Sequence, residues 1–199
     1  MISRSLPLVG TLVFLGVICG WRPWLQSRRH GSSGILLFRS GHWQQNVRDT
    51  LAVVLAVSVV GQAIAAAASP ESISLLDAIS QPAATQVTGT LLLFGGLVFL
   101  VIAQLDLGAS WRIGIEEGAR PGLVTGGLYR FCRNPIFLAI LMTLLGYALL
   151  LPTVLSLILL LGAWLGIRKQ VLAEEASSCV PMETPIASMR AASGAFCQE

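Results

Sequence analysis

Charged residues are scarce in this chain. They make up 12% of the 199 residues, against roughly 25% in typical soluble domains, while 54% are hydrophobic and the mean hydropathy is +0.75. A water-soluble fold of this length could not bury so much apolar surface, so the composition excludes a soluble domain of any size. The formal net charge of +3 is too small for a nucleic-acid-binding protein, and the arginines lie between apolar stretches instead of along one stripe.

Cysteine and histidine are also few and show no metal or redox motif. The two histidines, His30 and His42, are too far apart to share one helix face. Neither a CxxC pair nor a metal-ligand spacing occurs among the four cysteines, which are Cys19, Cys132, Cys179 and Cys197. We therefore expect neither a disulfide framework nor a metal site, and we interpret the cysteines as free thiols.

What the chain does have is a series of apolar stretches, at 6–21, 51–68, 87–105, 136–151 and 153–167. No cleavage site follows the first stretch, so we interpret it as a membrane anchor and not as a signal peptide. Because backbone polar groups in lipid must be paired within a segment, and no alternating barrel pattern occurs, we expect helices. The fold class is therefore predicted to be an all-α integral membrane protein with about five transmembrane helices, the last two forming a tight hairpin at Pro152.

The arginines predict the orientation in a bacterial inner membrane. Segments 22–48 and 112–133 are rich in arginine and are expected to be cytoplasmic, whereas segment 69–86 contains Glu71 and Asp77 but neither Lys nor Arg. This pattern places the N-terminus in the periplasm and the C-terminus in the cytoplasm. Four tryptophans are expected to act as interfacial anchors: Trp21, Trp24, Trp43 and Trp111.

A glycine-rich turn precedes the fourth apolar stretch. From Gly122 the sequence reads Gly-Leu-Val-Thr-Gly-Gly-Leu-Tyr-Arg-Phe-Cys-Arg-Asn-Pro-Ile-Phe. Asn134 is a good N-cap and Pro135 a good first helical residue, so the positive end of a helix would face the cytoplasm and suit an anion such as a carboxylate.

The side chains around this helix start would add further contacts. Arg130 and Arg133 could make charge-assisted hydrogen bonds, while Tyr129 and Phe131 could stack on a flat ring such as adenine. An ordinary helix cap with snorkelling arginines explains the same residues, and spacing alone favours that interpretation.

The order of these motifs resembles the isoprenylcysteine carboxyl methyltransferase-like family of integral membrane proteins. The resemblance rests on Leu-Val-Thr-Gly-Gly-Leu-Tyr-Arg, on Arg133 to Phe137, on the following apolar hairpin and on Glu174-Glu175, and it covers about 111–175. It implies S-adenosylmethionine as cofactor, bound on the cytoplasmic side, and a membrane lipid or lipid-linked acceptor reached from the bilayer.

The same resemblance implies roles for individual residues. Tyr129, Arg133, Asn134 and Pro135 would line the cofactor pocket, and Glu174 or Glu175 would act as catalytic groups near the cofactor or acceptor. Many members of the family have His and Tyr where this chain has Asn134 and Phe137, so an imidazole and a hydroxyl are missing.

Three further segments are Trp21-Arg22-Pro23-Trp24, 38–48 and Trp111-Arg112-Ile113-Gly114. In these segments the chain is also similar to a narrower group, the NccN and CzcN proteins that accompany nickel, cobalt, zinc and cadmium efflux systems in bacteria. It implies a component of a heavy-metal resistance system, with cation-efflux proteins as partners and an indirect role in metal handling.

The chain is predicted to divide into N-terminal membrane helices with a basic loop at 1–110, a methyltransferase-like motif and hairpin at 111–175, and a disordered cytoplasmic tail at 176–199. In the resembled family the tail is an amphipathic helix with a Gly-x-x-Tyr-x-x-Tyr pattern, which Pro181 and Pro185 would break here. Synonymous codons for 176–189 can be chosen so that the neighbouring reading frame carries that pattern, and we therefore hypothesise a one-base shift near the codon for Ala176. With the present tail, we expect methyl transfer to be weak or absent.

Three functions remain open from the sequence. The first is a component of a heavy-metal efflux system whose methyl transfer is impaired by the tail. The second is an active methyltransferase of a membrane lipid or lipidated thiol. The third is a non-enzymatic membrane subunit that packs against a transporter through Gly95 and Gly96, since small residues let membrane helices approach closely.

Overall fold

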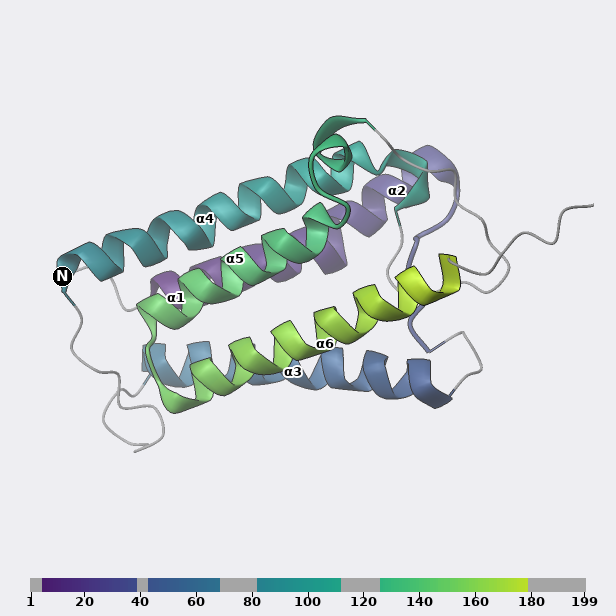
Figure 1. Ribbon diagram of the computed structural model, residues 1–199. Helices are drawn as coiled ribbons and strands as arrows, with labels where there is room; N and C mark the ends of the chain where they lie inside the picture. Colours follow the sequence, from purple (N-terminus) through teal and green to yellow (C-terminus); the bar gives the residue numbers. More distant parts are fainter. Residues whose placement is uncertain (1–4, 39–42, 69–81, 112–125, 179–199) are drawn as a thin grey trace, which may run out of the picture. The chain divides into compact units, whose positions relative to one another are not determined.

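The computed structural model describes residues 5–38, 43–68, 82–111 and 126–178, with side chains up to 172. Every regular element in these ranges is helical (Figure 1). The elements are α1 (Leu6–Leu15), the π-helix η1 (Gly16–Trp21), α2 (Arg22–His30), α3 (Trp43–Ala68), α4 (Ala83–Asp106), the 3-10 helices η3 (Gly108–Ser110) and η4 (Gly127–Arg130), α5 (Pro135–Leu150) and α6 (Val154–Ser178). The chain forms two compact units, residues 1–166 and 167–199, and the second begins within α6.

The predicted all-α membrane fold is confirmed. Four helical stretches are long and apolar enough to cross a membrane, namely Leu6–His30, Trp43–Ala68, Ala83–Asp106 and Val154–Leu172. α5 is apolar but shorter, with 16 residues. At 1.5 Å per residue it is about 24 Å long, less than the roughly 30 Å hydrocarbon core of a bilayer.

The first span extends further than the sequence suggests. We predicted it to end at Trp21, whereas helix continues through η1 and α2 to His30. Pro23 has no N–H to donate, and the π-helix just before it shifts the hydrogen-bond register, so that the Arg22 N–H bonds the Val17 carbonyl. The helix ends at Gly31, whose φ of +72° is left-handed. The predicted end of the first span at Trp21 is therefore wrong, because the residues that follow it up to His30 are helical.

Glycines let α4 and α5 pack closely in the first unit, where Figure 1 shows them side by side with α1. A Cβ at Gly146 would collide with the backbone of Leu93, and one at Gly96 would collide with Thr143. Gly96 is thus enclosed inside the protein, whereas Gly95 faces outward with open space around it. The prediction that Gly95 and Gly96 form one face for a partner is wrong, because only Gly95 is exposed.

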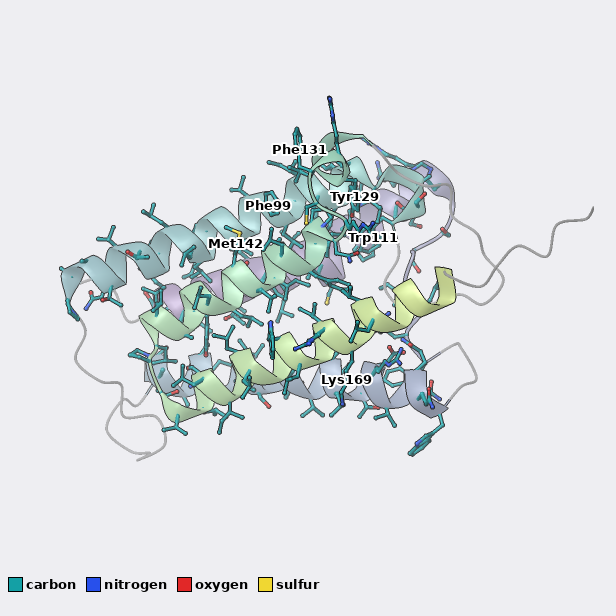
Figure 2. All side chains as sticks on the ribbon, in the orientation of Figure 1. Phe99, Trp111, Tyr129, Phe131, Met142 and Lys169 are labelled. Carbon is teal, nitrogen blue, oxygen red and sulfur yellow. The ribbon has the colours of Figure 1, made fainter. Side chains whose placement is uncertain are left out.

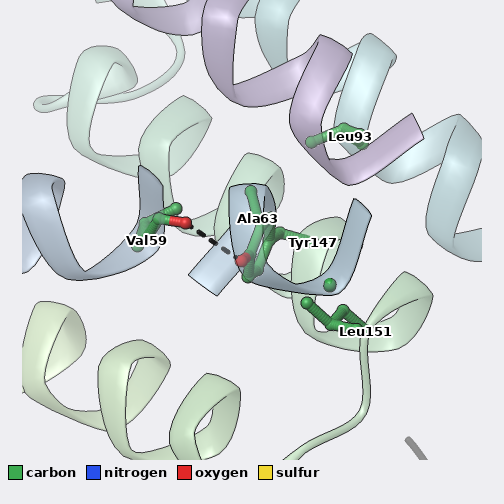
Figure 3. Packing of buried hydrophobic residues seen from close by; sticks show 6 residues of the cluster. Val59, Ala63, Leu93, Tyr147 and Leu151 are labelled. Atoms are coloured by element: carbon green, nitrogen blue, oxygen red, sulfur yellow. Dashed lines mark hydrogen bonds between the residues drawn. The ribbon is translucent and has the colours of Figure 1, made fainter. Parts of the chain in front are cut away.

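A buried polar network links α3 to the turn between α5 and α6. The Tyr147 hydroxyl lies 3.1 Å from the Val59 carbonyl within the apolar core (Figure 3) and 3.2 Å from Gln62 Oε1. Gln62 Nε2 in turn donates to the hydroxyls of Thr153 and Ser156, the latter at 2.9 Å. The short turn that begins after Leu150 is therefore fixed to α3, and each of these polar side chains is satisfied away from water.

Candidate functional site

The predicted motif lies where α4 ends, at η4 and at the start of α5. Asp106, the last residue of α4, accepts a hydrogen bond from the Leu128 N–H at 2.8 Å through Oδ2. Gly127 has a φ of +57°, and a Cβ there would collide with the Asp106 carboxylate. The turn can therefore approach α4 this closely only because residue 127 is glycine.

Tyr129 lies on this turn and is partly buried. Burial, followed by the negative charge of Asp106 and the neighbouring Cys132, raises the pKa of Tyr129 from 10.0 to about 12. The phenol is therefore neutral at physiological pH and keeps its proton as a hydrogen-bond donor.

Phe131 and Arg130 lie at the outer side of the same turn. The Phe131 side chain is 84% exposed and points away from the helices in Figure 2. The Arg130 guanidinium lies 5.9 Å from the centre of its ring. The turn therefore carries one exposed aromatic ring, that of Phe131, and one partly buried phenol, that of Tyr129.

The start of α5 agrees with its predicted local structure. Asn134 is the N-cap residue, and its carbonyl accepts the first helical hydrogen bond from the Leu138 N–H at 3.2 Å. Its side chain makes no capping hydrogen bond, so it leaves the first-turn N–H groups of α5 to another acceptor. Pro135 is buried at the first position of the helix, and Arg133 is exposed beside it. The structure thus gathers Tyr129, Arg133, Asn134 and Pro135 around η4 and the start of α5.

The two predicted glutamates belong to the second compact unit of the chain. Glu174 and Glu175 lie in the last turns of α6, within the unit that starts at Ile167. Their side chains are outside the described part of the chain, so their catalytic role stays a prediction. The segment 112–125, which includes Gly122, and the tail 179–199, where the altered pattern was noted, are also outside the described residues.

Sequence reasoning missed a clamp between Arg22 and the end of α4. The Arg22 side chain is 2% exposed and donates through Nη2 to the carbonyls of Gln104, at 3.1 Å, and Gly108, at 2.7 Å. Gln26 adds a hydrogen bond to the Ala109 carbonyl at 3.0 Å. A cation here adds a donor for the carbonyls at the end of α4 and offsets the negative end of the helix. Arg22 is therefore a packing residue and not a loop arginine.

Trp111 completes this clamp. Its ring lies 4.8 Å from the Arg22 guanidinium and is only 3% exposed, so the prediction of an interfacial anchor is wrong at this position. The other three predicted anchors, Trp21, Trp24 and Trp43, are exposed. No local pattern relates Arg22 to Trp111, since the two residues lie on segments far apart in the chain.

An apolar groove of about 320 Å³ lies between α5 and α6. Five leucines and one tryptophan line it: Leu141, Leu145, Leu157, Leu160, Leu161 and Trp164. Within the described residues, no three His, Cys, Asp or Glu side chains are grouped so that they could hold a metal ion.

These helices and this corner define a multi-pass helical membrane protein with a polar and aromatic turn at the end of its third span. Residues 84–176 match a family described as phospholipid methyltransferase. The match takes in α4, η4, α5 and nearly all of α6, so the similarity begins about one helix earlier than the motif at 111–175 suggested. No curated protein and no solved structure matches the chain.

Proposed function

We propose that this protein transfers a methyl group from S-adenosylmethionine to a membrane lipid or lipid-linked acceptor. The observation that carries the proposal is the match of 84–176 to phospholipid methyltransferases, over a region where η4 and the start of α5 form one polar and aromatic corner. The ordinary capping interpretation accounts for Asn134 and Pro135, but it does not explain why a tyrosine and an exposed phenylalanine share the same turn.

The residues at this corner fit the cofactor by their chemistry. Arg133 and the first-turn N–H groups of α5 are donors for its carboxylate, and Asn134 leaves those groups to another acceptor. Tyr129 and Phe131 offer surfaces for the adenine ring. Pro135 holds the start of the helix in place because it is buried.

S-adenosylmethionine supplies an electrophilic methyl carbon: the acceptor forms a bond to it as the carbon–sulfur bond breaks, and the electron pair stays on sulfur. This reaction depends on placing the acceptor in line and needs little acid–base help, so a Ser-His-Asp set is not required. Glu174 and Glu175 are assigned to the neighbourhood of the cofactor or acceptor. With the present tail, we expect S-adenosylmethionine to bind more weakly than it does to a form whose tail carries the Gly-x-x-Tyr-x-x-Tyr pattern.

The groove between α5 and α6 supports the proposed acceptor class. Its lining of leucine and tryptophan has no charged group, so an acyl or prenyl chain is the ligand that suits it. Both helices lie in the region that matches the lipid-modifying family. In the proposed orientation, the N-terminus is periplasmic, the C-terminus is cytoplasmic, and the corner at η4 faces the cytoplasm of a bacterial inner membrane.

The experiment is calorimetric titration of the detergent-purified protein with S-adenosylmethionine, beside a version whose tail carries the family pattern. We expect both to bind, the second more tightly. Arg133→Ala should weaken binding, whereas the matched control Arg28→Ala should not, because Arg28 stacks on the exposed Trp24 of α2. If neither version of the protein binds S-adenosylmethionine, the proposal is refuted and a non-enzymatic membrane subunit is favoured.

A second candidate function is service to a nickel, cobalt and cadmium efflux system. The support for it is the contact between Arg22 and Trp111, since these residues come from two of the three segments on which the narrower resemblance rests. In a host with such a system, deletion of this protein should lower metal tolerance. If Arg133→Ala lowers tolerance equally, the role acts through methyl transfer; if tolerance is unchanged by the deletion itself, this candidate is wrong.

A further inference from the structure

Asp106 stands at an electrostatically unfavourable position. It is the last residue of α4, where the helix dipole disfavours a negative charge. The Arg22 guanidinium bonds the carbonyls of Gln104 and Gly108, on either side of Asp106 in the sequence. That cation offsets the negative end of α4, so a carboxylate can be kept there.

The carboxylate faces η4 and not open water. Oδ2 accepts the Leu128 N–H at 2.8 Å, and the space beside it is so narrow that Gly127 has no room for a Cβ. The bond joins residues 22 positions apart, so it fixes the turn to α4 in a way that local turn geometry cannot. Tyr129 follows Leu128 directly and takes its placement from this attachment.

We propose that Asp106 is a positioning residue, whose carboxylate holds η4 against the end of α4 and so sets where Tyr129 lies for the cofactor. The inference rests on the proposed function for its last clause only. Asp106 does not touch the reacting atoms in this scheme. Its effect passes through the Leu128 N–H and the backbone of Gly127.

The test uses fluorine NMR of the detergent-purified full chain labelled with 3-fluorotyrosine. The chain has two tyrosines, so two resonances are expected, and Tyr129→Phe assigns them. Asp106→Ala should shift the Tyr129 resonance and leave that of Tyr147, which is buried in another part of the bundle. Asp106→Asn keeps an acceptor oxygen and should return the resonance towards its original position. Gly127→Ala should shift the Tyr129 resonance as well, because the added methyl group collides with the Asp106 carboxylate and displaces η4.

Asp49→Ala is the matched control. The Asp49 carboxylate also accepts a backbone N–H at 2.8 Å, from Phe38, but it lies on α3. Its loss should leave the Tyr129 resonance in place. If Asp106→Ala also leaves that resonance unchanged, or if Asp49→Ala moves it equally, the positioning role is wrong.

Titration with S-adenosylmethionine separates this inference from the proposed function. Asp106→Ala should weaken binding by about ten-fold or more, which is the size expected for loss of a hydrogen bond to a charged group, and Asp106→Asn should weaken it less. If the original protein and Asp106→Ala bind S-adenosylmethionine equally well, Asp106 does not position Tyr129 for the cofactor. If the original protein does not bind, the proposed function fails, while a shifted Tyr129 resonance would still support the attachment of η4 by Asp106.

Discussion

Arg22 on α2 stacks on the ring of Trp111, 4.8 Å from its centre, while the same guanidinium bonds two carbonyls at the end of α4. These contacts join the first span to the third. They lie at the end of α4, where Asp106 holds η4. The region that matches the methyltransferase family begins at 84, so this contact ties the N-terminal helix to it.

We expect Arg22→Met to destabilise the protein by about 2–5 kcal/mol, because it removes the buried charge-assisted hydrogen bonds to the carbonyls of Gln104 and Gly108. Thermal unfolding in detergent measures the effect. The control Arg28→Ala removes an exposed stacking pair and should change stability by less than about 0.5 kcal/mol. Similar losses in both variants would mean that the Arg22 clamp does not matter for stability.

Gly146→Ala should destabilise by about 1–3 kcal/mol, since the added methyl group collides with the backbone of Leu93 in α4. Gly95→Ala places the same group in open space and should be neutral or slightly stabilising, given the higher helix propensity of alanine. The measurement is again thermal unfolding. A destabilising Gly95→Ala would show that the outward face of α4 is covered by a partner.

Gln62→Leu should destabilise by about 1–3 kcal/mol, because the hydroxyls of Thr153 and Ser156 then lose a buried partner. Ser58→Ala is the control on the same helix, since its hydroxyl bonds only the Val54 carbonyl at an exposed position. Urea or thermal unfolding of the two variants gives the comparison. If they lose equal stability, the network does not fix the turn after α5.

Tyr129 gives a prediction for alkaline pH. Its pKa is about 12 in the folded protein against 10.0 for a free side chain, so the folded state holds the proton more tightly. The stability from this group is complete below pH 10 and is lost as the pH rises towards 12. Between pH 10 and pH 12, the Tyr129→Phe variant should therefore lose less stability than the original protein. The stability of both, measured at intervals from pH 9 to 12, checks this, and parallel curves would contradict it.

The sequence predicted the membrane helices because long apolar runs report burial in lipid directly. It also located the start of α5, since Asn134-Pro135 carries its own capping and φ preferences. Arg22 and Trp111 were misjudged because an arginine or tryptophan near a span end has the same local pattern whether it faces the interface or another helix. Asp106 went unnoticed, since its partner is 22 residues away and no spacing rule relates them.

Gly96 was misassigned for a related reason. Gly95 and Gly96 are neighbours in sequence, but adjacent helix positions face directions about 100° apart, so only one of the pair can lie against α5. Composition shows that small residues are present. It does not show which side of the helix meets a neighbour.

The short length of α5 has a consequence for the surrounding lipid. A hydrophobic helix about 24 Å long is several ångströms shorter than an average bilayer core, and such mismatch is relieved in part by local thinning of the membrane. Thinning of this kind would bring the headgroups of lipids next to α5 deeper than those elsewhere. Under the proposed function, the polar end of an acceptor whose chain lay along α5 would then sit closer to Asn134, and the membrane itself would shorten the distance between substrate and helix start.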